Sequence, residues 1–215
     1  MQTGIFQGRV RVPYAYGCYG YTRGGGKTWH GGIDLVGQDD TTIRMPFYTG
    51  ADGVPKAITG TVTTARIVTD HANRTWEWGY YVCVRLDDAQ TPDAVNYLYF
   101  CHCARLLVKA GQRVKSGDAL AVMGNTGNAA LNDPPYAHCH LEVRATATGG
   151  GLDPTAYSGT ANRAGSYGAA DTAPAETRLQ LITVGPVSQG DADAILAVCR
   201  ARGLDKQGLY TSRWA

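Results

Sequence analysis

The chain from about residue 7 to residue 157 alternates short runs of β-branched and aromatic residues with turns. The turns carry signals such as Gly-Asp, Gly-Asn and Asp-Pro, and runs bounded in this way predict β-strands. Neither a long helix nor a repeat of solenoid length is predicted in this span. We therefore expect a mainly β domain. Its strands are predicted at residues 57–68, 80–86, 95–103, 119–123 and 138–144.

The composition changes at residues 158–177, which consist mostly of glycine, alanine, serine, threonine and aspartate. Such a segment buries little apolar surface, so we expect a linker. It separates a predicted domain at residues 1–157 from a small α/β unit at residues 178–215, which has few residues for an independent domain. We expect this unit to pack on the first domain or to pair with a second copy, which would give a homodimer.

The small unit is predicted to contain a strand at residues 178–184, a helix at residues 191–202 and a strand at residues 208–212. Ser188 or the Gln-Gly pair after it would cap the helix, because side chains of this kind satisfy the free N–H groups of the first turn. Gly203 would end the helix. The unit is therefore expected to be a βαβ arrangement.

Length, charge and cysteine content exclude several classes of protein. The chain has 215 residues, a net charge of +2 and no run of Lys or Arg, so nucleic acid is not an expected partner. No segment approaches the ~20 apolar residues of a membrane span. The N-terminus has neither a cationic start nor an apolar stretch, so we expect synthesis in the cytoplasm without a signal peptide. The six cysteines are then expected to be free thiols.

Histidine is scarce, and four of the five histidines lie in phrases that contain other candidate metal ligands. His30 opens the phrase His-Gly-Gly-Ile-Asp that ends at Asp34, His102 ends Tyr-Phe-Cys-His, and His138 and His140 flank one cysteine. Two imidazoles and one carboxylate can hold zinc and leave one position for water, which is the arrangement of a hydrolase site. Any one of these histidines taken alone is more often an ordinary core or loop residue, and it is their coincidence that favours a metal site.

Alternation along the last predicted strand arranges its polar residues. His138, His140 and Glu142 would share one face, while Cys139 and its apolar neighbours would share the other and enter the core. The two imidazoles would then lie close enough to approach one ion or one reaction centre. The remaining histidine, His71, lies in a polar turn and is expected to be solvated.

The same alternation applied to residues 100–103 would point His102 away from both Cys101 and Cys103. On this basis the two thiols are not expected to share a metal with His102. Tyrosines near the N-terminus are additional candidates for oxyanion donors or for aromatic packing. They are Tyr14, Tyr16, Tyr19 and Tyr21.

The order of these motifs resembles that of the lysostaphin-type (LytM-like) zinc endopeptidases, which cut bacterial peptidoglycan. Residues 108–128 (VKAGQRVKSGDALAVMGNTGN) resemble that family's segment between its second and third motifs. Residues 51–53 and 57–62 resemble its strand after the first motif. The resemblance covers about residues 7–157, and three ordered motifs make it specific.

The resemblance implies a fold, a cofactor and a role for each site residue. It implies an antiparallel β-sheet domain of the LytM-like (duplicated hybrid motif) type, with Zn²⁺ as cofactor and peptidoglycan as partner. His30, Asp34 and His140 would be the zinc ligands, and His102 and His138 the catalytic residues beside the metal-bound water. The bond that is cut stays open between a glycine bridge, a direct cross-link and a stem-peptide bond.

Three residues depart from the family's usual pattern, but none of them removes a ligand. Phe100 stands where the family often has Tyr, Cys139 replaces a usual Leu, and Leu141 replaces a usual Phe. A non-catalytic adaptor of the same family typically lacks ligands that are all present here. Biotinyl and lipoyl carriers need a modifiable Lys at the tip of a hairpin, typically beside Met or Ala, and no Lys stands in that context here. A phosphocarrier would gain nothing from Asp34.

Two further expectations concern biology. Because no signal peptide is expected, the wall-cutting enzyme would have to be released by other means, as a phage endolysin is at lysis. The opening of the C-terminal unit at residues 182–186 (ITVGP) faintly resembles half of a SPOR-type peptidoglycan-binding module. The unit is thus a candidate for wall binding or for dimerisation.

Overall fold

The computed structural model describes residues 4–68, 78–131, 136–168 and 188–201. The chain divides into two compact units, Met1–Thr172 and Ala173–Ala215. The first contains every strand that the structure describes, and the second contains one helix. Among the described residues, no helix is long and apolar enough to cross a membrane.

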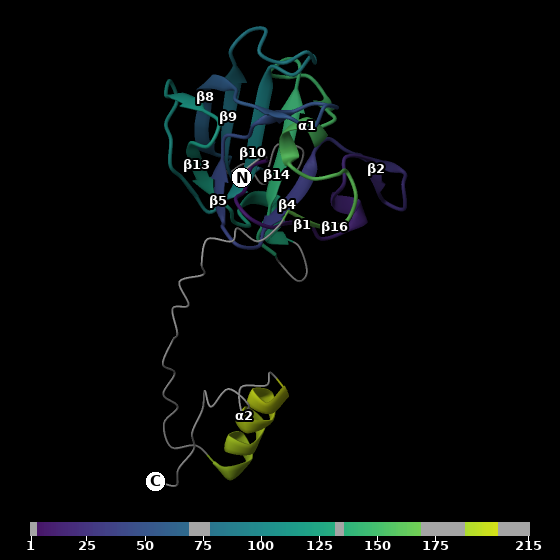
Figure 1. The fold of residues 1–215 in the computed structure, drawn as a ribbon, viewed down its shortest axis with the longest axis vertical. Coiled ribbons are helices and arrows are strands. Elements are labelled where there is room, and N and C mark those ends of the chain that lie inside the picture. The colour runs from purple at the N-terminus through teal and green to yellow at the C-terminus, as the bar shows by residue number, and fades with distance from the viewer. Residues whose placement is uncertain (1–3, 69–77, 132–135, 169–187, 202–215) are drawn as a thin grey trace. The chain divides into compact units, whose positions relative to one another are not determined.

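One large antiparallel sheet forms the framework of the first unit (Figure 1). Its strand order is β12-β8-β9-β10-β14-β4-β1-β16, and β15 pairs with β14. The prediction of a mainly β, antiparallel domain is confirmed. The strands of this sheet are β1 (Val10–Val12), β4 (Ile33–Gly37), β8 (Thr59–Ile67), β9 (Tyr80–Leu86), β10 (Tyr97–Cys103), β12 (Arg113–Lys115), β14 (Cys139–Arg144), β15 (Gly151–Leu152) and β16 (Gly165–Tyr167).

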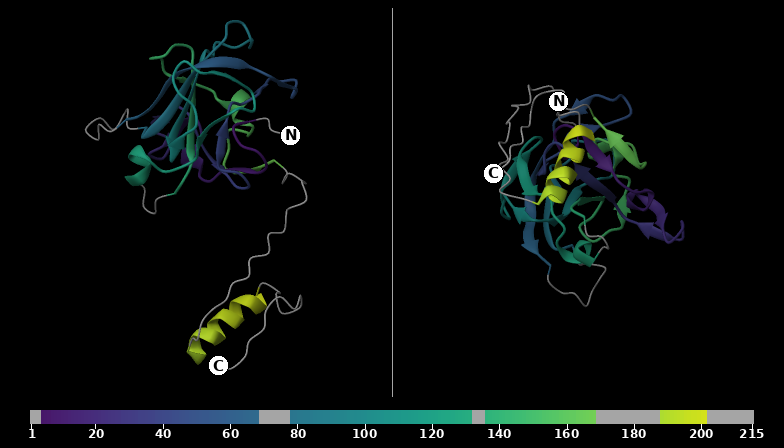
Figure 2. Two further views of the ribbon diagram at one scale, coloured as in Figure 1. Left: turned by 90° about the vertical axis from the view of Figure 1, so that its left-hand side faces the viewer. Right: turned by 90° about the horizontal axis from the view of Figure 1, so that it is seen from below.

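Three smaller sheets and short helical segments complete the first unit, and their course can be followed from two further sides in Figure 2. The three-stranded sheet consists of β5 (Thr42–Arg44), β11 (Arg105–Leu106) and β13 (Ala119–Val122). The two-stranded sheets are β2 (Gly20–Arg23) with β3 (Thr28–His30), and β6 (Tyr48–Thr49) with β7 (Pro55–Lys56). The helical segments are η1 (Ala15–Gly17), η2 (Gly127–Leu131) and α1 (Thr155–Ser158).

The apolar core lies on one face of the large sheet, where the three-stranded sheet contributes Ile43 and Leu120 to it. Cys139 and Leu141 of β14 are fully buried in this core, and so is Phe100 of β10. Neighbouring residues of β14 point to the opposite face, since side chains alternate along a strand. The predicted placement of Cys139 in the core is confirmed. The opposite face is therefore left for polar side chains.

A β-bulge at His102 makes the side chains of Cys101 and Cys103 point in other directions than the sequence predicted. Between Phe100 and Cys103 the register of β10 with β9 shifts, and His102 has a left-handed φ of 64°. An extra residue of this kind reverses the alternation beyond it. Cys103 therefore packs in the main core, whereas Cys101 packs on the opposite face among aromatic residues. The expectation that both thiols point away from His102 was wrong.

The first part of the expected linker is also ordered differently from the prediction. Residues 165–167 form β16, which pairs with β1 at the edge of the large sheet. Their Gly-Ser-Tyr composition offers little apolar surface, but an edge strand needs only backbone hydrogen bonds on one side. Composition alone therefore missed this strand.

In the second unit, helix α2 (Gln189–Ala201) corresponds to the helix predicted at residues 191–202. The Ser188 hydroxyl accepts a hydrogen bond from the backbone N–H of Asp191 at 3.2 Å, which confirms the expected cap. The strands predicted at residues 178–184 and 208–212 lie outside the described residues.

Candidate metal centre and active site

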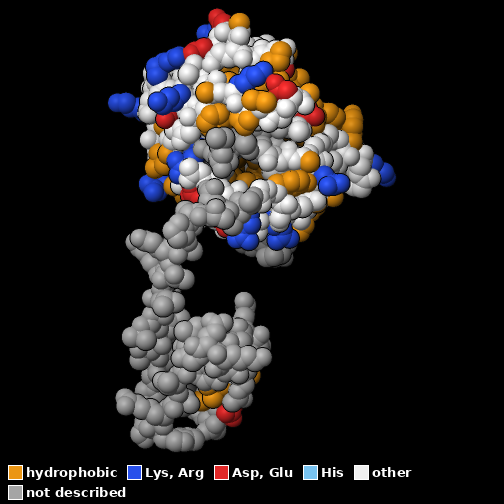
Figure 3. Space-filling view, viewed as in Figure 1, with side chains coloured by type: hydrophobic (Ala, Val, Ile, Leu, Met, Phe, Trp, Pro, Cys, Tyr) orange, Lys and Arg blue, Asp and Glu red, His pale blue; other side chains and the backbone are white. Residues whose placement is uncertain are grey.

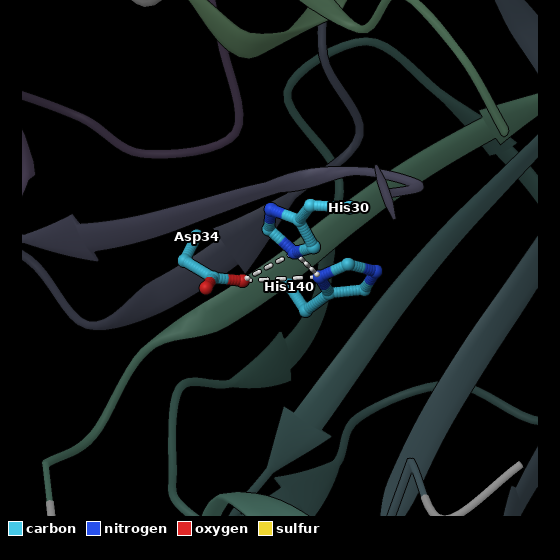
Figure 4. Close-up of side chains that lie close together, drawn as sticks. All are labelled: His30, Asp34 and His140. Carbon is cyan, nitrogen blue, oxygen red and sulfur yellow. Dashed lines mark hydrogen bonds and ion pairs between the residues drawn. The ribbon is translucent and has the colours of Figure 1, made fainter. Parts of the chain in front are cut away.

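Three side chains meet on the polar face of the large sheet (Figure 4). They are His30 at the end of β3, Asp34 in β4 and His140 in β14, and one donor atom of each lies within 4.8 Å of the others. Nε2 of His30 is 3.0 Å from Nδ1 of His140, which is 3.0 Å from Oδ1 of Asp34. His140 and Asp34 are directly opposed in the register of β14 with β4. The sheet itself thus places the imidazole next to the carboxylate.

Gly32, between β3 and β4, allows the segment that carries His30 to approach β14. A Cβ atom on Gly32 would lie 2.3 Å from the carbonyl oxygen of Leu141 and 2.8 Å from Cε1 of His140. No side chain fits at such distances, so the backbone can pass this close to β14 only with glycine. This close passage brings the side chain of His30 to the same side of the sheet as that of Asp34, four residues later in the chain.

Each candidate ligand has a partner for its outward-facing atom. Nδ1 of His30 donates to the carbonyl oxygen of Cys18 at 2.8 Å, and Nε2 of His140 lies 3.3 Å from Oε2 of Glu142. Oδ2 of Asp34 accepts a hydrogen bond from Arg23 at 3.1 Å. These partners turn one imidazole nitrogen of each histidine and one carboxylate oxygen toward the centre, as metal ligands require. The donor set of two imidazoles and one carboxylate therefore fits zinc.

Glu142 is itself held by a buried cation. Nε of Arg144 donates to Oε1 of Glu142 at 2.6 Å, and both side chains are 8% exposed. The Arg144 guanidinium also lies 5.1 Å from the ring centroid of Trp78 and 4.7 Å from that of Tyr99. Cation–π contacts of this kind stabilise a desolvated guanidinium. The Glu142 carboxylate is consequently fixed in the orientation that contacts His140.

Electrostatics divides the three candidate ligands. Burial opposes ionisation of Asp34, but hydrogen bonds and charges from His140 and His30 outweigh it and hold its pKa well below the usual value. Burial also disfavours the charged form of His140, yet Asp34 and Glu142 together raise its pKa to about 9. The pKa of His30 is lowered, mainly by burial. In the metal-free protein at neutral pH, His140 is therefore the candidate ligand whose imidazole is positively charged, with a proton on both ring nitrogens.

His102 and His138 lie beside this donor set, with ring centroids 4.9 Å apart. Nε2 of His138 is 3.9 Å from Oδ1 of Asp34, and the ring of His102 is 6.0 Å from that of His140. Nδ1 of His102 lies 3.0 Å from the carbonyl oxygen of Thr126. Nδ1 of His138 lies 3.2 Å from the carbonyl oxygen of Tyr136. Each Nδ1–H donates there, which leaves Nε2 free to accept a proton.

Burial keeps both of these flanking histidines neutral. It lowers the pKa of His102 to about 3, and it also lowers the pKa of His138. At neutral pH both rings are therefore uncharged, and the low pKa of His102 makes it a weak base, which favours His138 for proton transfer. The five residues singled out from the sequence are thus gathered on one face of the sheet, while His71 lies outside the described residues.

Tyr136 borders the site and was not singled out from the sequence. Its ring stacks on that of His138 with centroids 4.6 Å apart, and Tyr14 contacts its edge at 5.6 Å. Tyr14 in turn stacks on Tyr16 at 4.9 Å. The signal in the sequence is proximity, because Tyr136 precedes the candidate catalytic His138 by only two residues.

The other two candidate tyrosines lie on a different surface. Tyr19 and Tyr21 each contact the edge or face of Trp29, with ring centroids 5.1 Å and 5.0 Å apart. Trp29 directly precedes His30 in β3, so its side chain points away from the candidate ligands. These two tyrosines pack with Trp29 and are not placed to donate to a reacting group.

Cysteine is not part of the donor set among the described residues. All five described cysteines are buried and free, as expected from the sequence. Cys101 is the register partner of His140 and so shares its face of the sheet, but it does not belong to the cluster of candidate ligands. Burial raises the pKa of the Cys101 thiol well above its usual value. It therefore stays protonated beneath the site.

Residues 28–154 match peptidase family M23, and this segment is more than half of the chain. The chain therefore belongs to peptidase family M23. The matched segment contains the three candidate ligands and both flanking histidines. The family resemblance inferred from the sequence is thereby confirmed.

Several solved structures are similar to this chain. The catalytic domain of the antimicrobial peptidase lysostaphin from Staphylococcus simulans is 20% identical, and the match covers 65% of this chain and 86% of that chain with a TM-score of 0.45. A catalytic-domain mutant of the prophage-encoded M23 protein EnpA from Enterococcus faecalis is also 20% identical. That match covers 65% of this chain and 87% of that chain, with a TM-score of 0.46. LytU is 24% identical, and the match covers 67% of this chain and 81% of that chain, with a TM-score of 0.46.

The contact between Glu142 and His140 predicts an effect on metal affinity. Replacing Glu142 with Gln removes the charge that orients and polarises His140, so zinc affinity should fall by about 10- to 100-fold. Competition with a chelator measures it, on variants whose circular dichroism shows them to be folded. As a matched control, Asp88→Asn removes an exposed carboxylate, 85% accessible, and should change nothing. An unaltered affinity in folded Glu142→Gln protein would disprove the orienting role.

The raised pKa of His140 predicts how metal affinity depends on pH. Zinc must displace a proton from Nδ1 at any pH below about 9. The apparent zinc affinity should therefore rise about tenfold per pH unit from pH 7 toward this value, and then level off. Calorimetry in buffers of different ionisation enthalpy should detect about one proton released at pH 7. A flat affinity over this range, with no proton released, is the opposing result.

Proposed function

We propose that this chain is a zinc-dependent endopeptidase that hydrolyses peptide bonds in bacterial peptidoglycan. The observation that carries the proposal is that two neutral imidazoles border a donor set of two imidazoles and one carboxylate. Three protein ligands leave one position of tetrahedral zinc for water or substrate. Membership of peptidase family M23 supports the reaction class, and the three ordered sequence motifs support peptidoglycan as the substrate.

In this proposal His30, Asp34 and His140 hold the zinc ion. When bound, zinc lowers the pKa of water and polarises the scissile carbonyl group. The residues of the chain supply orientation and proton transfer. Glu142 and the Cys18 carbonyl keep the imidazole rings aligned, and the buried sheet face limits the access of bulk water.

Each of the two flanking histidines acts through its Nε2 atom. Nε2 of His138, which faces Asp34, takes the proton from the attacking water and passes it to the leaving amine nitrogen. His102 lies next to His138, and its unprotonated Nε2 accepts a hydrogen bond from the attacking water, which orients that water. Because both rings are neutral at pH 7, neither needs to lose a proton before the reaction begins.

The biological setting of this activity is a further part of the proposal. Release from the cytoplasm as a phage endolysin, and wall binding or dimerisation through residues 178–215, stay predictions from the sequence. Purified walls treated with the full chain and with a chain ending at residue 172 would test the second of these.

Replacing His138 with Ala tests the proposed function most simply. The variant should retain one zinc ion per chain, because His138 is not a ligand, while hydrolysis of purified peptidoglycan falls by about 10²- to 10⁴-fold. Zinc is measured by elemental analysis, and released fragments by mass spectrometry. Chelation of the wild-type protein should abolish the activity, and added zinc should restore it. Undiminished turnover in the variant would overturn the role of His138, and an inactive, zinc-loaded wild type would indicate an adaptor.

A further inference from the structure

Arg23, the last residue of β2, lies directly beside the candidate ligands. Its Nη2 atom is 2.9 Å from Nε2 of His30 and 3.1 Å from Oδ2 of Asp34. Its Nε atom lies 3.3 Å from the carbonyl oxygen of Tyr16. The Arg23 side chain is 43% exposed, whereas that of Asp34 is 2% exposed. Arg23 therefore connects a buried donor set with the solvent from which a substrate arrives.

A bound metal ion affects the two contacts of Nη2 differently. Oδ1 of Asp34 faces the imidazoles, so Oδ2 remains available to Arg23. Nε2 of His30 has a single lone pair, and a metal ion that takes it leaves Nη2 without that acceptor. Nη1 makes no hydrogen bond with any residue that the structure describes. The guanidinium consequently retains N–H donors for an additional acceptor next to the centre.

Charge around the centre favours an anion as this acceptor. The Glu142 carboxylate is paired with Arg144, and Asp34 is the remaining carboxylate of the donor set. A bound divalent cation together with Arg23 outweighs this single negative charge. Lys and Arg side chains also appear at the hairpin to which β2 belongs (Figure 3). An anionic group of the substrate is therefore attracted to the side of the centre on which Arg23 lies.

We propose that Arg23 is a specificity-determining residue, which binds a carboxylate next to the scissile bond. The planar guanidinium matches a carboxylate with two parallel hydrogen bonds. This inference rests on the proposed function. In peptidoglycan, a carboxylate on the carbon bonded to the scissile nitrogen occurs where D-alanine is cross-linked directly to diaminopimelate. Glycine bridges and lysine-linked bonds lack it, so Arg23 favours the direct cross-link over those two kinds of bond.

The test compares two forms of one substrate with the zinc-loaded full chain. The first is a cross-linked peptide dimer with a free carboxylate on the diaminopimelate carbon that bears the scissile nitrogen, and the second has a primary amide there. Wild-type kcat/KM should be about 10- to 100-fold higher for the free acid, as a charge-assisted pair implies. In Arg23→Gln the ratio should fall to about one, and Arg23→Lys should give an intermediate ratio because Lys lacks the fork.

Lys27 provides a matched control on the same hairpin. It is an exposed cation located between β2 and β3, and Lys27→Gln removes the same charge as Arg23→Gln. The preference for the free acid should persist in Lys27→Gln. An equal loss of preference in both variants would assign the effect to the overall charge of the hairpin and overturn the proposal.

A binding measurement separates recognition from the chemical step. In the His138→Ala background, calorimetry should show that the free-acid dimer binds about tenfold more tightly than the amide, and that adding Arg23→Gln removes this difference. A pentapeptide ending in D-alanyl-D-alanine offers the same carboxylate at a chain terminus. Its cleavage with the same dependence on Arg23 would support the carboxylate contact and identify the terminus as a second source.

The outcomes distinguish this inference from the proposed function. If wild-type protein cleaves neither form, the proposed function itself fails. If it cleaves both forms at equal rates, the proposed function stands and the inference about Arg23 is wrong. A uniform loss of activity on both forms in Arg23→Gln would mean that Arg23 only orients Asp34, which also contradicts the inference.

Discussion

The antiparallel pairing of β14 with β4 is the constraint on which the rest of the site depends. It sets His140 opposite Asp34, and the residue on either side of His140 enters the apolar core. A register shift of one residue would turn the imidazole into the core and a thiol toward the carboxylate. Burial of Cys139 and Leu141 therefore fixes the register, and the register fixes the geometry of the candidate metal centre.

Contacts from neighbouring groups orient the three candidate ligands so that their donor atoms point toward one another. The Cys18 carbonyl contacts His30, Glu142 contacts His140, and Arg23 contacts Asp34 as well as His30, so each ligand is held with one donor atom turned inward. The cost of burying Glu142 is offset by Arg144, which is itself sandwiched against aromatic rings. Burial also keeps His102 and His138 neutral, which links the packing of the sheet to the chemistry of the site.

The parts of the site that the sequence could predict depend on local periodicity or on ordered motifs. Alternation along β14 correctly separated His140 from Cys139 because both lie in a regular strand. It failed at His102, since a bulge with a left-handed residue is imposed by tertiary contacts. The contact of Arg23 with Asp34 could not be predicted either, because it joins β2 to β4 and depends on how these two strands are placed in the folded domain. β16 was missed because edge pairing leaves no apolar pattern.

X-ray absorption spectroscopy at the zinc edge tests the central claim most directly, since it reports which atoms bind the metal. For the zinc-loaded chain, the account predicts one zinc ion with only nitrogen and oxygen neighbours at about 2.0–2.1 Å, two of them from imidazoles. A sulfur neighbour at about 2.3 Å would contradict it, since a thiolate would then replace the water needed for hydrolysis. Three or four imidazoles would contradict it too, because His102 or His138 would then be a ligand and not a base.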